Sequence, residues 1–474
     1  MVWIRHPTDT MNTKAIIAII AVIAIVGAGA GAVVLTHNNS NHETVRNSNN
    51  LDGRLTVFGN ANNDDFLDSR DVEFVKKVIA GEEKATYYTC YKTYGGSTVQ
   101  RSFCDANVDG KIDQADVDWI KNMVDRKNNM LLYFYDVDGV IGSCTYPLTT
   151  SAVGYKSNYE ALLVLGEADL CKYSCDQVGN SGSYSKWYTA YSSAKCYGSR
   201  FTPDYETFIG DEPSYILSGT RAWFDPDMEE KCGPLGIDVV RLPFYEDNWT
   251  VPAIITLGYL TAHEDPAYAY AEKCDKVYDT IATAIKDIKL EDRPFVYAGY
   301  AGNSVAKMHG GVQELVYLAG GQTPLDKGFS TGSIDAEGVM TMNPDWIIID
   351  QSGPYYGFLE TFTTHDETKY NEAYALYNTD AKFIKAINLS DAYDNGKVLF
   401  LEQGIYMGVA SYIACAYVAN HIWGDKFNFD VDALLKDYIE SYHPEFSYED
   451  FKDIEFFTLA ELQSYATEKG IITA

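Results

Sequence analysis

Residues 265–289 read DPAYAYAEKCDKVYDTIATAIKDIK, with no glycine and with no proline after the first turn. The apolar residues of this stretch recur at the spacing of one helix face. They are Cys274, Val277, Tyr278, Ile281, Ile285 and Ile288. At ~1.5 Å per residue the segment is roughly 36 Å long. We therefore expect one long amphipathic helix that separates two halves of the larger part of the chain.

Apolar runs typical of β-strands lie on both sides of this helix and alternate with helical stretches. The runs are residues 152–155, 215–217, 239–242, 295–300, 346–350 and 398–401. Such alternation favours mostly parallel sheets that are covered by helices. The predicted fold class is therefore α/β, with two Rossmann-like lobes, residues 131–264 and 290–474, joined by the rigid helix 265–289.

Two acidic twelve-residue loops, 60–71 and 105–116, precede the α/β part. In each loop, positions 1, 3, 5, 9 and 12 carry the side-chain oxygens that calcium prefers. These residues are Asp105, Asn107, Asp109, Asp113 and Asp116 in the second loop, with the Lys111 carbonyl, and Asn60, Asn62, Asp64, Asp68 and Asp71 in the first. The first loop has Asp65 where the second has Gly110, and Asn at position 1, so weaker binding is expected there. A solvated acidic turn is the alternative for each loop.

Each loop leads directly into a helical apolar pattern, beginning at Val72 in one case and at Val117 in the other. This pair of loop–helix units, residues 55–128, resembles a dockerin, a calcium-folded module that binds a cohesin-type protein. The resemblance implies a small all-α, EF-hand-like module with structural Ca²⁺. The loops differ at two positions that contribute to partner choice in that family, Ser69-Arg70 against Gln114-Ala115. Whether a cohesin-type partner exists is therefore left open.

Residues 15–35 contain no charged or polar side chain and no proline. Their helical length of about 31 Å is close to the hydrocarbon thickness of a bilayer. Arg5 and Lys14 precede the run, which places the N-terminus in the cytoplasm by the positive-inside rule. We expect residues 1–36 to form a cytoplasmic start and a single transmembrane helix, followed by a polar linker, 37–54, and an extracellular remainder. A cleaved signal peptide is the alternative.

The formal net charge of −30 disfavours nucleic acid and anionic membrane surfaces as partners. Nine cysteines are too few for a disulfide scaffold, although disulfides are expected in an exported chain. The candidates are Cys90, Cys104, Cys171, Cys175, Cys196 and Cys232. The sequence contains no phosphate-loop or His-Glu-x-x-His motif, which argues against an enzyme.

A series of short motifs runs through residues 133–444. They are Asp136-Val137-Asp138-Gly139, Val153-Gly154-Tyr155, Asp204-Tyr205-Glu206, Leu318-Ala319-Gly320-Gly321, Asn343-Pro344-Asp345 and Asp394-Asn395-Gly396. Their order and spacing resemble the substrate-binding proteins of ABC importers, in the group that serves iron-siderophore complexes, haem and cobalamin. The resemblance implies that a ligand is held between two lobes that one helix joins. A single helix resists bending, so lobe closure should be small.

Loops beyond the carboxyl ends of the expected strands should line the ligand site. The candidate ligand-binding residues are Tyr155, Tyr159, Arg221, Trp223, Tyr300, Asn303, His309, Gln403 and Tyr406. Flat aromatic faces suit a tetrapyrrole or siderophore, and Arg221 suits an anionic metal chelate. The alternative for each residue is an ordinary position in the core or on the surface.

The resembled family docks on its permease through one carboxylate on each lobe, and Glu206 and Glu337 occupy the matching positions. A solvated glutamate at a helix start is the alternative. The expected function is a membrane-anchored, extracytoplasmic solute-binding protein that delivers a metal chelate or tetrapyrrole to an ABC importer. The rival is a dockerin-bearing surface component, such as a scaffold, an adhesin or a polysaccharide-degrading enzyme. The sequence does not discriminate between ligands.

Overall fold

The structure is a computed structural model. It describes residues 51, 53–175, 193–300, 304–305, 311–329, 332–333, 336–350, 390–401, 403–444, 446–450 and 456–468. The expected membrane segment, residues 15–35, lies outside this set. Among the helices within it, none is long and apolar enough to cross a bilayer.

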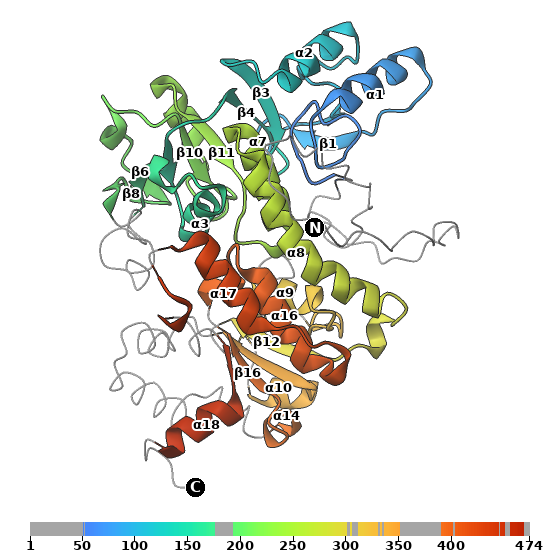
Figure 1. Ribbon diagram of the computed structural model, residues 1–474, viewed down its shortest axis with the longest axis vertical. Coiled ribbons are helices and arrows are strands. Elements are labelled where there is room, and N and C mark those ends of the chain that lie inside the picture. Colours follow the sequence, from blue (N-terminus) through green and yellow to red (C-terminus); the bar gives the residue numbers. More distant parts are fainter. Residues whose placement is uncertain are drawn as a thin grey trace, which may run out of the picture. The chain divides into compact units, whose positions relative to one another are not determined.

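The predicted long helix is present as α8 (Glu264–Ile285), which Figure 1 shows as a single unbroken helix. Its buried residues follow the spacing expected from the sequence, and Cys274 and Ile281 are fully enclosed. Glu264 and Asp265 lie in the first turn, where negative charge interacts favourably with the helix dipole. The helix packs against α7 (Asp247–Thr261) and α3 (Lys156–Leu165) on the N-terminal side, and against α16 (Ser411–Ile422) on the C-terminal side.

The sheet before α8 is parallel and has five strands in the order β11-β10-β5-β6-β7. The strands are β5 (Ser151–Val153), β6 (Cys171–Ser174), β7 (Lys195–Cys196), β10 (Tyr215–Ser218) and β11 (Asp238–Arg241). The central strands β5 and β10 are buried at every residue, as parallel strands covered on both faces require. We call this region the N lobe.

The sheet after α8 has six strands in the order β14-β13-β12-β15-β16-β17. Its three central strands, β12 (Val296–Tyr300), β15 (Trp346–Asp350) and β16 (Val398–Leu401), are parallel. The edge strands are antiparallel and were not predicted: β13 (Ser304–Val305), β14 (Gly332–Ser333) and β17 (Phe456–Thr458). The helices α9 (Val312–Leu318) and α16 contact each other, and α17 (Val431–Tyr442) contacts α16. This C lobe and the N lobe confirm the predicted α/β class.

The segment that carries the acidic loops contains two helices, α1 (Ser69–Ala80) and α2 (Gln114–Val124). Each begins at an Asp that caps the helix reciprocally with a second Asp, Asp68 with Asp71 and Asp113 with Asp116. The connection forms a hairpin of β1 (Tyr88–Tyr91) and β2 (Thr98–Arg101). The all-α prediction for this module was therefore wrong, because the inserted connection pairs with itself.

The Asp136–Gly139 motif, one of those that carry the resemblance, is a turn. It joins β3 (Met130–Tyr135) to β4 (Ile141–Tyr146) in a separate two-stranded sheet. The Asp136 carboxylate holds the turn by accepting hydrogen bonds from the amides of Asp138 and Val140, at 2.9 and 2.8 Å. The hairpin contacts the preceding module, since Phe58 N donates to Tyr133 O at 2.9 Å.

We call residues 55–128, which carry the two acidic loops, the calcium-loop module after its predicted ligand. One continuous apolar core joins this module to the N lobe and α8. It contains Val75, Ile120 and Met123 of the module together with Leu257 of α7 and Cys274 of α8. Polar pairs cross the same boundary, for example Thr56 Oγ1 and Thr256 Oγ1, which are buried at 3.1 Å. The module is thus packed into the lobe through its own hydrophobic face.

All nine cysteines lie in the described part of the chain, and each is a free thiol. The expected disulfides are not formed. Cys90 and Cys104, which flank the inserted hairpin, are buried in different apolar clusters.

Truncation of Ile281 to Ala tests the contribution of the α8 face to stability. Ile281 is fully buried, so Ile281→Ala should lower the free energy of unfolding by about 2–5 kcal/mol through lost burial and a residual cavity. The control is Lys276→Ala on the same helix, whose side chain is exposed and whose removal should leave stability nearly unchanged. Denaturant unfolding followed by circular dichroism measures both. Equal effects of the two substitutions would contradict the assigned packing.

Candidate functional site

The carboxyl ends of β5 and β10 bring two loops of the N lobe together. Gly154 N donates to Leu217 O at 2.9 Å, which links the loop after β5 to β10. A Cβ on Gly154 would lie 2.7 Å from the ring of Phe224, so only glycine permits this approach. Tyr155 follows and is the N-cap residue of α3. This edge of the sheet is where an open parallel sheet places its ligand loops.

An arginine surrounded by aromatic rings lies beside these loops. Arg200 stands at the tip of the hairpin formed by β8 (Gly198–Ser199) and β9 (Thr202–Pro203). Its guanidinium lies 4.8 Å from the ring centroid of Tyr155, 4.9 Å from that of Phe201 and 5.6 Å from that of Phe224. These distances are typical of cation–π contacts. We call Tyr155, Arg200, Phe201 and Phe224 the Arg200 cluster.

Two large aromatic side chains project into solvent in this region. Trp223 is 56 % exposed and precedes Phe224, and Phe201 is 49 % exposed. The rings of Tyr155 and Phe224 contact the ring of Tyr245, which is buried in the N lobe. Exposed aromatic groups held by a rigid base supply contact area at low entropic cost.

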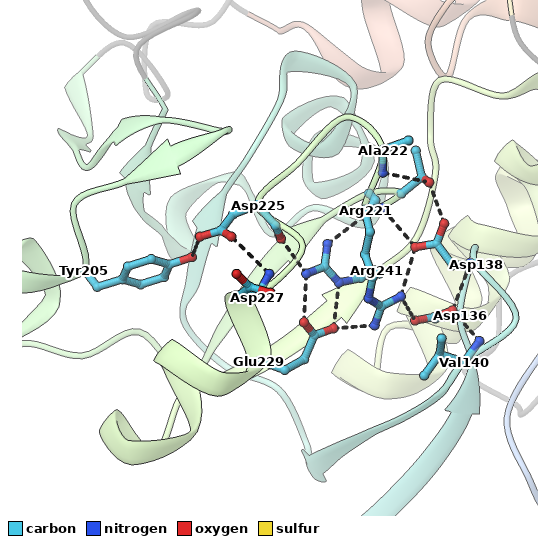
Figure 2. A network of polar contacts seen from close by, with 12 residues as sticks. Asp136, Asp138, Val140, Tyr205, Arg221, Ala222, Asp225, Asp227, Glu229 and Arg241 are labelled. Atoms are coloured by element: carbon cyan, nitrogen blue, oxygen red, sulfur yellow. Dashed lines mark hydrogen bonds and ion pairs between the residues drawn. The ribbon is translucent and has the colours of Figure 1, made fainter. Parts of the chain in front are cut away.

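A second arginine cluster fixes the start of the loop that carries Trp223 (Figure 2). The guanidinium of Arg221 contacts three carboxylates: Asp136 at 2.8 Å, Asp138 at 2.9 Å and Glu229 at 2.5 Å. Its backbone amide also donates to Asp138 at 2.9 Å. Arg221, which we had selected as a candidate ligand residue, is therefore buried and engaged within the protein.

Arg241, at the end of β11, completes this network (Figure 2). Its Nε and Nη2 donate to the two oxygens of Glu229 at 2.6 and 2.8 Å, in a bidentate arrangement. The remaining contacts are with the carbonyls of Gly219 at 3.1 Å and Asp225 at 2.8 Å, both in the loop after β10. The arginine thus ties that loop to the neighbouring strand.

The pKa values of two carboxylates in the network, Asp136 and Glu229, shift in opposite directions. Burial raises the pKa of Asp136 to about 6 even though Arg221 lies beside it. Burial also acts on Glu229, but hydrogen bonds and charge from Arg241 and Arg221 hold its pKa below the usual range. The Glu229 carboxylate is therefore the ionised centre that binds both arginines.

The other candidate ligand residues fall into two groups. Tyr159 and Tyr406 are buried in the core, away from solvent. Asn303 and His309 lie outside the described residues, as do the side chains of Tyr300 and Gln403. Of the two candidate docking residues, Glu206 is exposed in η2 (Tyr205–Phe208), whereas the side chain of Glu337 is outside the described set.

Sequence reasoning missed Arg200 and Phe201. The signal was present in Gly198-Ser199-Arg200-Phe201-Thr202-Pro203, where turn-forming residues surround a cation next to an aromatic ring. The pairing of Arg241 with Glu229 was also missed, because residues twelve apart in sequence meet only when β11 packs beside α6 (Met228–Cys232).

The two acidic loops share most of their internal hydrogen bonds, but they differ at position 6, where Gly110 has a φ of 94° and Asp65 has no positive φ. In both, the amide at position 5 donates to the Asn at position 3, at 3.0 Å. The carboxylate at position 12, Asp71 or Asp116, accepts the amides at positions 3 and 9. Position 4 has a positive φ in each, 57° at Asn63 and 59° at Val108. The shared pattern ties the backbone of positions 3, 5 and 9 to the side chains of positions 3 and 12.

Position 1 of each loop carries a buried oxygen that accepts no hydrogen bond within the described structure. These atoms are Oδ1 of Asn60 and Oδ1 of Asp105. An unpartnered buried oxygen is costly unless a cation or water binds it. Burial, together with the charge of neighbouring carboxylates, raises the pKa of Asp71 to about 7 and that of Asp105 to about 6. These oxygen donors fit Ca²⁺, although no compact group of three His, Cys, Asp or Glu side chains is found among the described residues.

Removal of Arg241 tests whether the network holds the loop after β10. Arg241→Met should lower the free energy of unfolding by about 3 kcal/mol or more, because Glu229 and two carbonyls lose their partner. Lys231→Met is the matched control, since Lys231 also pairs with this region through Asp225 but is half-exposed. It should cost much less. Thermal and denaturant unfolding measure both, and equal losses would contradict a central role for Arg241.

Comparison with known proteins locates two families in the chain. Residues 152–380 match the family model for periplasmic binding proteins, and residues 59–125 match that for the dockerin type I domain. Comparison with curated proteins gave no match.

Solved structures share the fold of the α/β part. FepB, a TroA-like periplasmic binding protein from Veillonella parvula, is 16% identical with a TM-score of 0.54 over 69% of this chain and 99% of that chain. An ABC transporter solute-binding protein from Sulfurospirillum deleyianum is 14% identical, with a TM-score of 0.52 over 68% and 98%. MolA from Haemophilus influenzae, solved with molybdate, is 11% identical, with a TM-score of 0.51 over 66% and 98%.

These matches confirm the predicted resemblance. Periplasmic binding proteins are extracytoplasmic, bind solutes and work with ABC permeases. The family is not enzymatic, which confirms that prediction as well. Residues 152–380 are thus similar to the periplasmic binding protein family, and a segment similar to the dockerin type I domain, residues 59–125, precedes them.

Proposed function

We propose that this protein is anchored to the cell membrane by residues 15–35 and captures a metal chelate or tetrapyrrole outside the cytoplasm. Iron-siderophore complexes, haem and cobalamin are the solutes that we infer. The observation that carries the proposal is the Arg200 cluster at the carboxyl edge of the N-lobe sheet, next to the exposed Trp223. The bound solute is then delivered to an ABC importer.

The chemistry of this surface supports a flat, anionic solute. Trp223 and Phe201 offer exposed aromatic faces, which bind planar or apolar surfaces. Arg200 adds a positive charge in a chain whose net charge is −30. A guanidinium stacked on aromatic rings keeps its donors in a fixed plane, which suits a carboxylate or an anionic chelate.

The binding site also draws on the C lobe in this proposal. Tyr300 ends β12, Asn303 and His309 come after it in sequence, and Gln403 follows β16. Ligand loops of parallel sheets occur at the carboxyl ends of such strands. In this proposal Tyr155 lines the same site from the N lobe. The helix α8 between the lobes supports a preformed site with little closure.

Ligand titration tests the site directly. The full chain should change the visible absorbance of one member of a panel of haem, ferric siderophore and cyanocobalamin. Trp223→Ala and Arg200→Met should each raise the Kd by about tenfold, equivalent to ~1.4 kcal/mol. Ile209→Ala is the control, because Ile209 is also an exposed apolar residue, 67 % against 56 % for Trp223, but lies on the other side of the Glu206 turn in sequence. Unchanged affinity in both site variants would remove this surface from the proposed site.

Glu206 and Glu337 are the residues that we propose to dock on the permease. Glu206 is exposed in the first turn of η2, and the Asp204 side chain caps that turn by accepting from the Glu206 amide at 3.2 Å. Both glutamates stand at helix starts, Glu337 in α10 (Ala336–Met342), and the exposed Glu206 carboxylate is available to a cationic partner surface.

Charge reversal separates docking from solute capture. The double variant Glu206→Lys, Glu337→Lys should abolish uptake of the solute by cells while leaving its Kd unchanged, because repulsion would act only at the permease. Asp211→Lys, an exposed carboxylate near η2, is the control and should transport normally. Normal uptake by the double variant, or loss of solute binding, would contradict the docking assignment.

We also propose that both acidic loops bind structural Ca²⁺. The ligands would be Asp105, Asn107, Asp109, the Lys111 carbonyl, Asp113 and Asp116 in one loop, and Asn60, Asn62, Asp64, Asp68 and Asp71 in the other. The unpartnered oxygens of Asn60 and Asp105 support this assignment. Weaker binding is expected in the first loop, because Asn60 is neutral where Asp105 is charged.

Calorimetric titration of the full chain tests the calcium assignment. The chain should bind about two Ca²⁺ ions with unequal affinity, and the variant Asp105→Asn, Asp116→Asn should lose the tighter one, since it removes two charged ligands. Asp118→Asn is the control, because Asp118 is exposed on α2, lies outside the loop in sequence and pairs with Lys121. Titration without heat in the parent chain would overturn the assignment.

A cohesin-type partner is the second candidate function of the module, and the dockerin match favours it. Ser69, Arg70, Gln114 and Ala115 remain exposed at the starts of α1 and α2. Since the two pairs differ chemically, one face of the module would be preferred over the other. A surface component that binds a cohesin and no solute would retain partner binding and fail the absorbance titration.

A further inference from the structure

The first acidic loop carries an aspartate that reaches the helix between the lobes. Asp65 stands at position 6, where the second loop has Gly110. Its carboxylate accepts hydrogen bonds from Arg54 Nε at 3.0 and 3.1 Å, and Arg54 Nη2 is paired with it as well. Arg54 Nη1 donates in turn to Asp275 of α8 at 2.7 Å. Arg54 is buried, so it joins the loop and the helix within the protein.

The backbone and the next side chain of the loop contact the same helix. Tyr268 of α8 donates its hydroxyl hydrogen to the carbonyl of Asp65 at 3.0 Å. The rings of Phe66 and Tyr268 lie 4.6 Å apart between centroids. A Cβ on Gly53 would approach the carbonyl oxygen of Asn63 to 2.7 Å, so the segment with Arg54 lies against the loop backbone. Asn63, Asp65 and Phe66, at positions 4, 6 and 7 of the loop, thus contact residues outside the loop.

The end of α2, which follows the second loop, contacts α7 and α8. Tyr259 of α7 donates to the carbonyl of Met123 at 3.2 Å. Arg126 forms an ion pair with Glu264, the first residue of α8, and its guanidinium lies 4.3 Å from the ring centroid of Tyr259. Both halves of the module therefore contact the N-terminal half of α8 or the helix before it.

We propose that the calcium-loop module is a calcium-dependent brace for α8, with Asp65 as the coupling residue, so that calcium regulates the helix that joins the solute-binding lobes. This inference rests on the proposed calcium binding and extends it from the module to the lobes. Position 6 is Asp65 in the first loop and Gly110 in the second, and only the aspartate can bind Arg54 through its side chain. Asp65 is not among the described residues with positive φ, so the loop does not need glycine there.

The coupling follows from the charges of the loop. Asp64 and Asp68 each pair with Arg70 at 2.8 Å, and both carboxylates repel that of Asp71. The loop thus has three carboxylates for one cation of its own, and bound calcium would supply the missing positive charge. When the loop opens, Asp65 between these carboxylates moves, and Arg54 and Tyr268 lose their partners in it. Arg54 is then a buried cation with Asp275 as its remaining carboxylate partner, which destabilises the adjoining part of α8.

Hydrogen–deuterium exchange on the full chain, with calcium and with a chelator, tests this proposal without any solute. In the parent chain, calcium should slow exchange of the α8 amides by about tenfold. In Arg54→Met the protection of α8 should fall at least several-fold, while calcium still protects residues 60–71 and 105–116. Tyr268→Phe, which removes only the hydroxyl, should reduce the effect partly and covers the case in which Arg54→Met does not fold.

Lys273→Met is the matched control. It removes an ion pair between α8 and Asp437 of α17, at 2.6 Å, and leaves the contacts with the module intact. Calcium protection of α8 should persist in this variant. Protection confined to residues 51–128 in the parent chain would overturn the coupling while leaving calcium binding in place. Absence of calcium binding by calorimetry would overturn both, and neither outcome bears on solute capture.

Discussion

The buried face of α8 is the constraint on which the rest of the structure depends. It contacts α7 and α3 of the N lobe and α16 of the C lobe, and its first turns contact the calcium-loop module. Each of these regions would expose an apolar surface without the helix, because Cys274, Val277 and Ile281 are buried among them. A continuous helix with no glycine in its interior resists bending, so the regions packed along it keep fixed positions relative to it. The lobes and the module are therefore built on one shared element.

Electrostatics sets the second constraint in this acidic protein. Two arginines, Arg221 and Arg241, are buried where strands β10 and β11 end, and Glu229 binds both. A buried charge pair of this kind contributes little net stability, since desolvation offsets much of the attraction, but it strongly disfavours other arrangements of the loop. The network thereby fixes the loop that presents Trp223 to solvent. The proposed solute surface is rigid for this reason.

The sequence predicted the parts of the fold that depend on periodicity. The strands at residues 215–217, 346–350 and 398–401 and the helix around Ile281 were all found, because apolar spacing reports burial directly. The short edge strands β13, β14 and β17 were not predicted, since two or three residues carry too little pattern. The role of the Asp136 turn was also missed, because its partner Arg221 is distant in sequence.

The candidate site was less predictable than the fold. Tyr159 and Tyr406 have the residue type of a ligand wall but lie in the core, and sequence alone does not separate these two uses of tyrosine. Arg200 gained its importance only when the β8–β9 hairpin placed it over Tyr155. The acidic loops were more predictable in their local structure, because the residues that shape each loop lie within twelve consecutive positions. Their binding of calcium remains a proposal.

Differential scanning calorimetry of the full chain, with calcium and with a chelator, tests most directly whether the module, the N lobe and α8 form one cooperative unit. The shared core predicts that they unfold in a single transition, and that chelation lowers the midpoint of that transition as a whole. A separate calcium-sensitive transition, with the main transition unchanged by the chelator, would contradict the shared core.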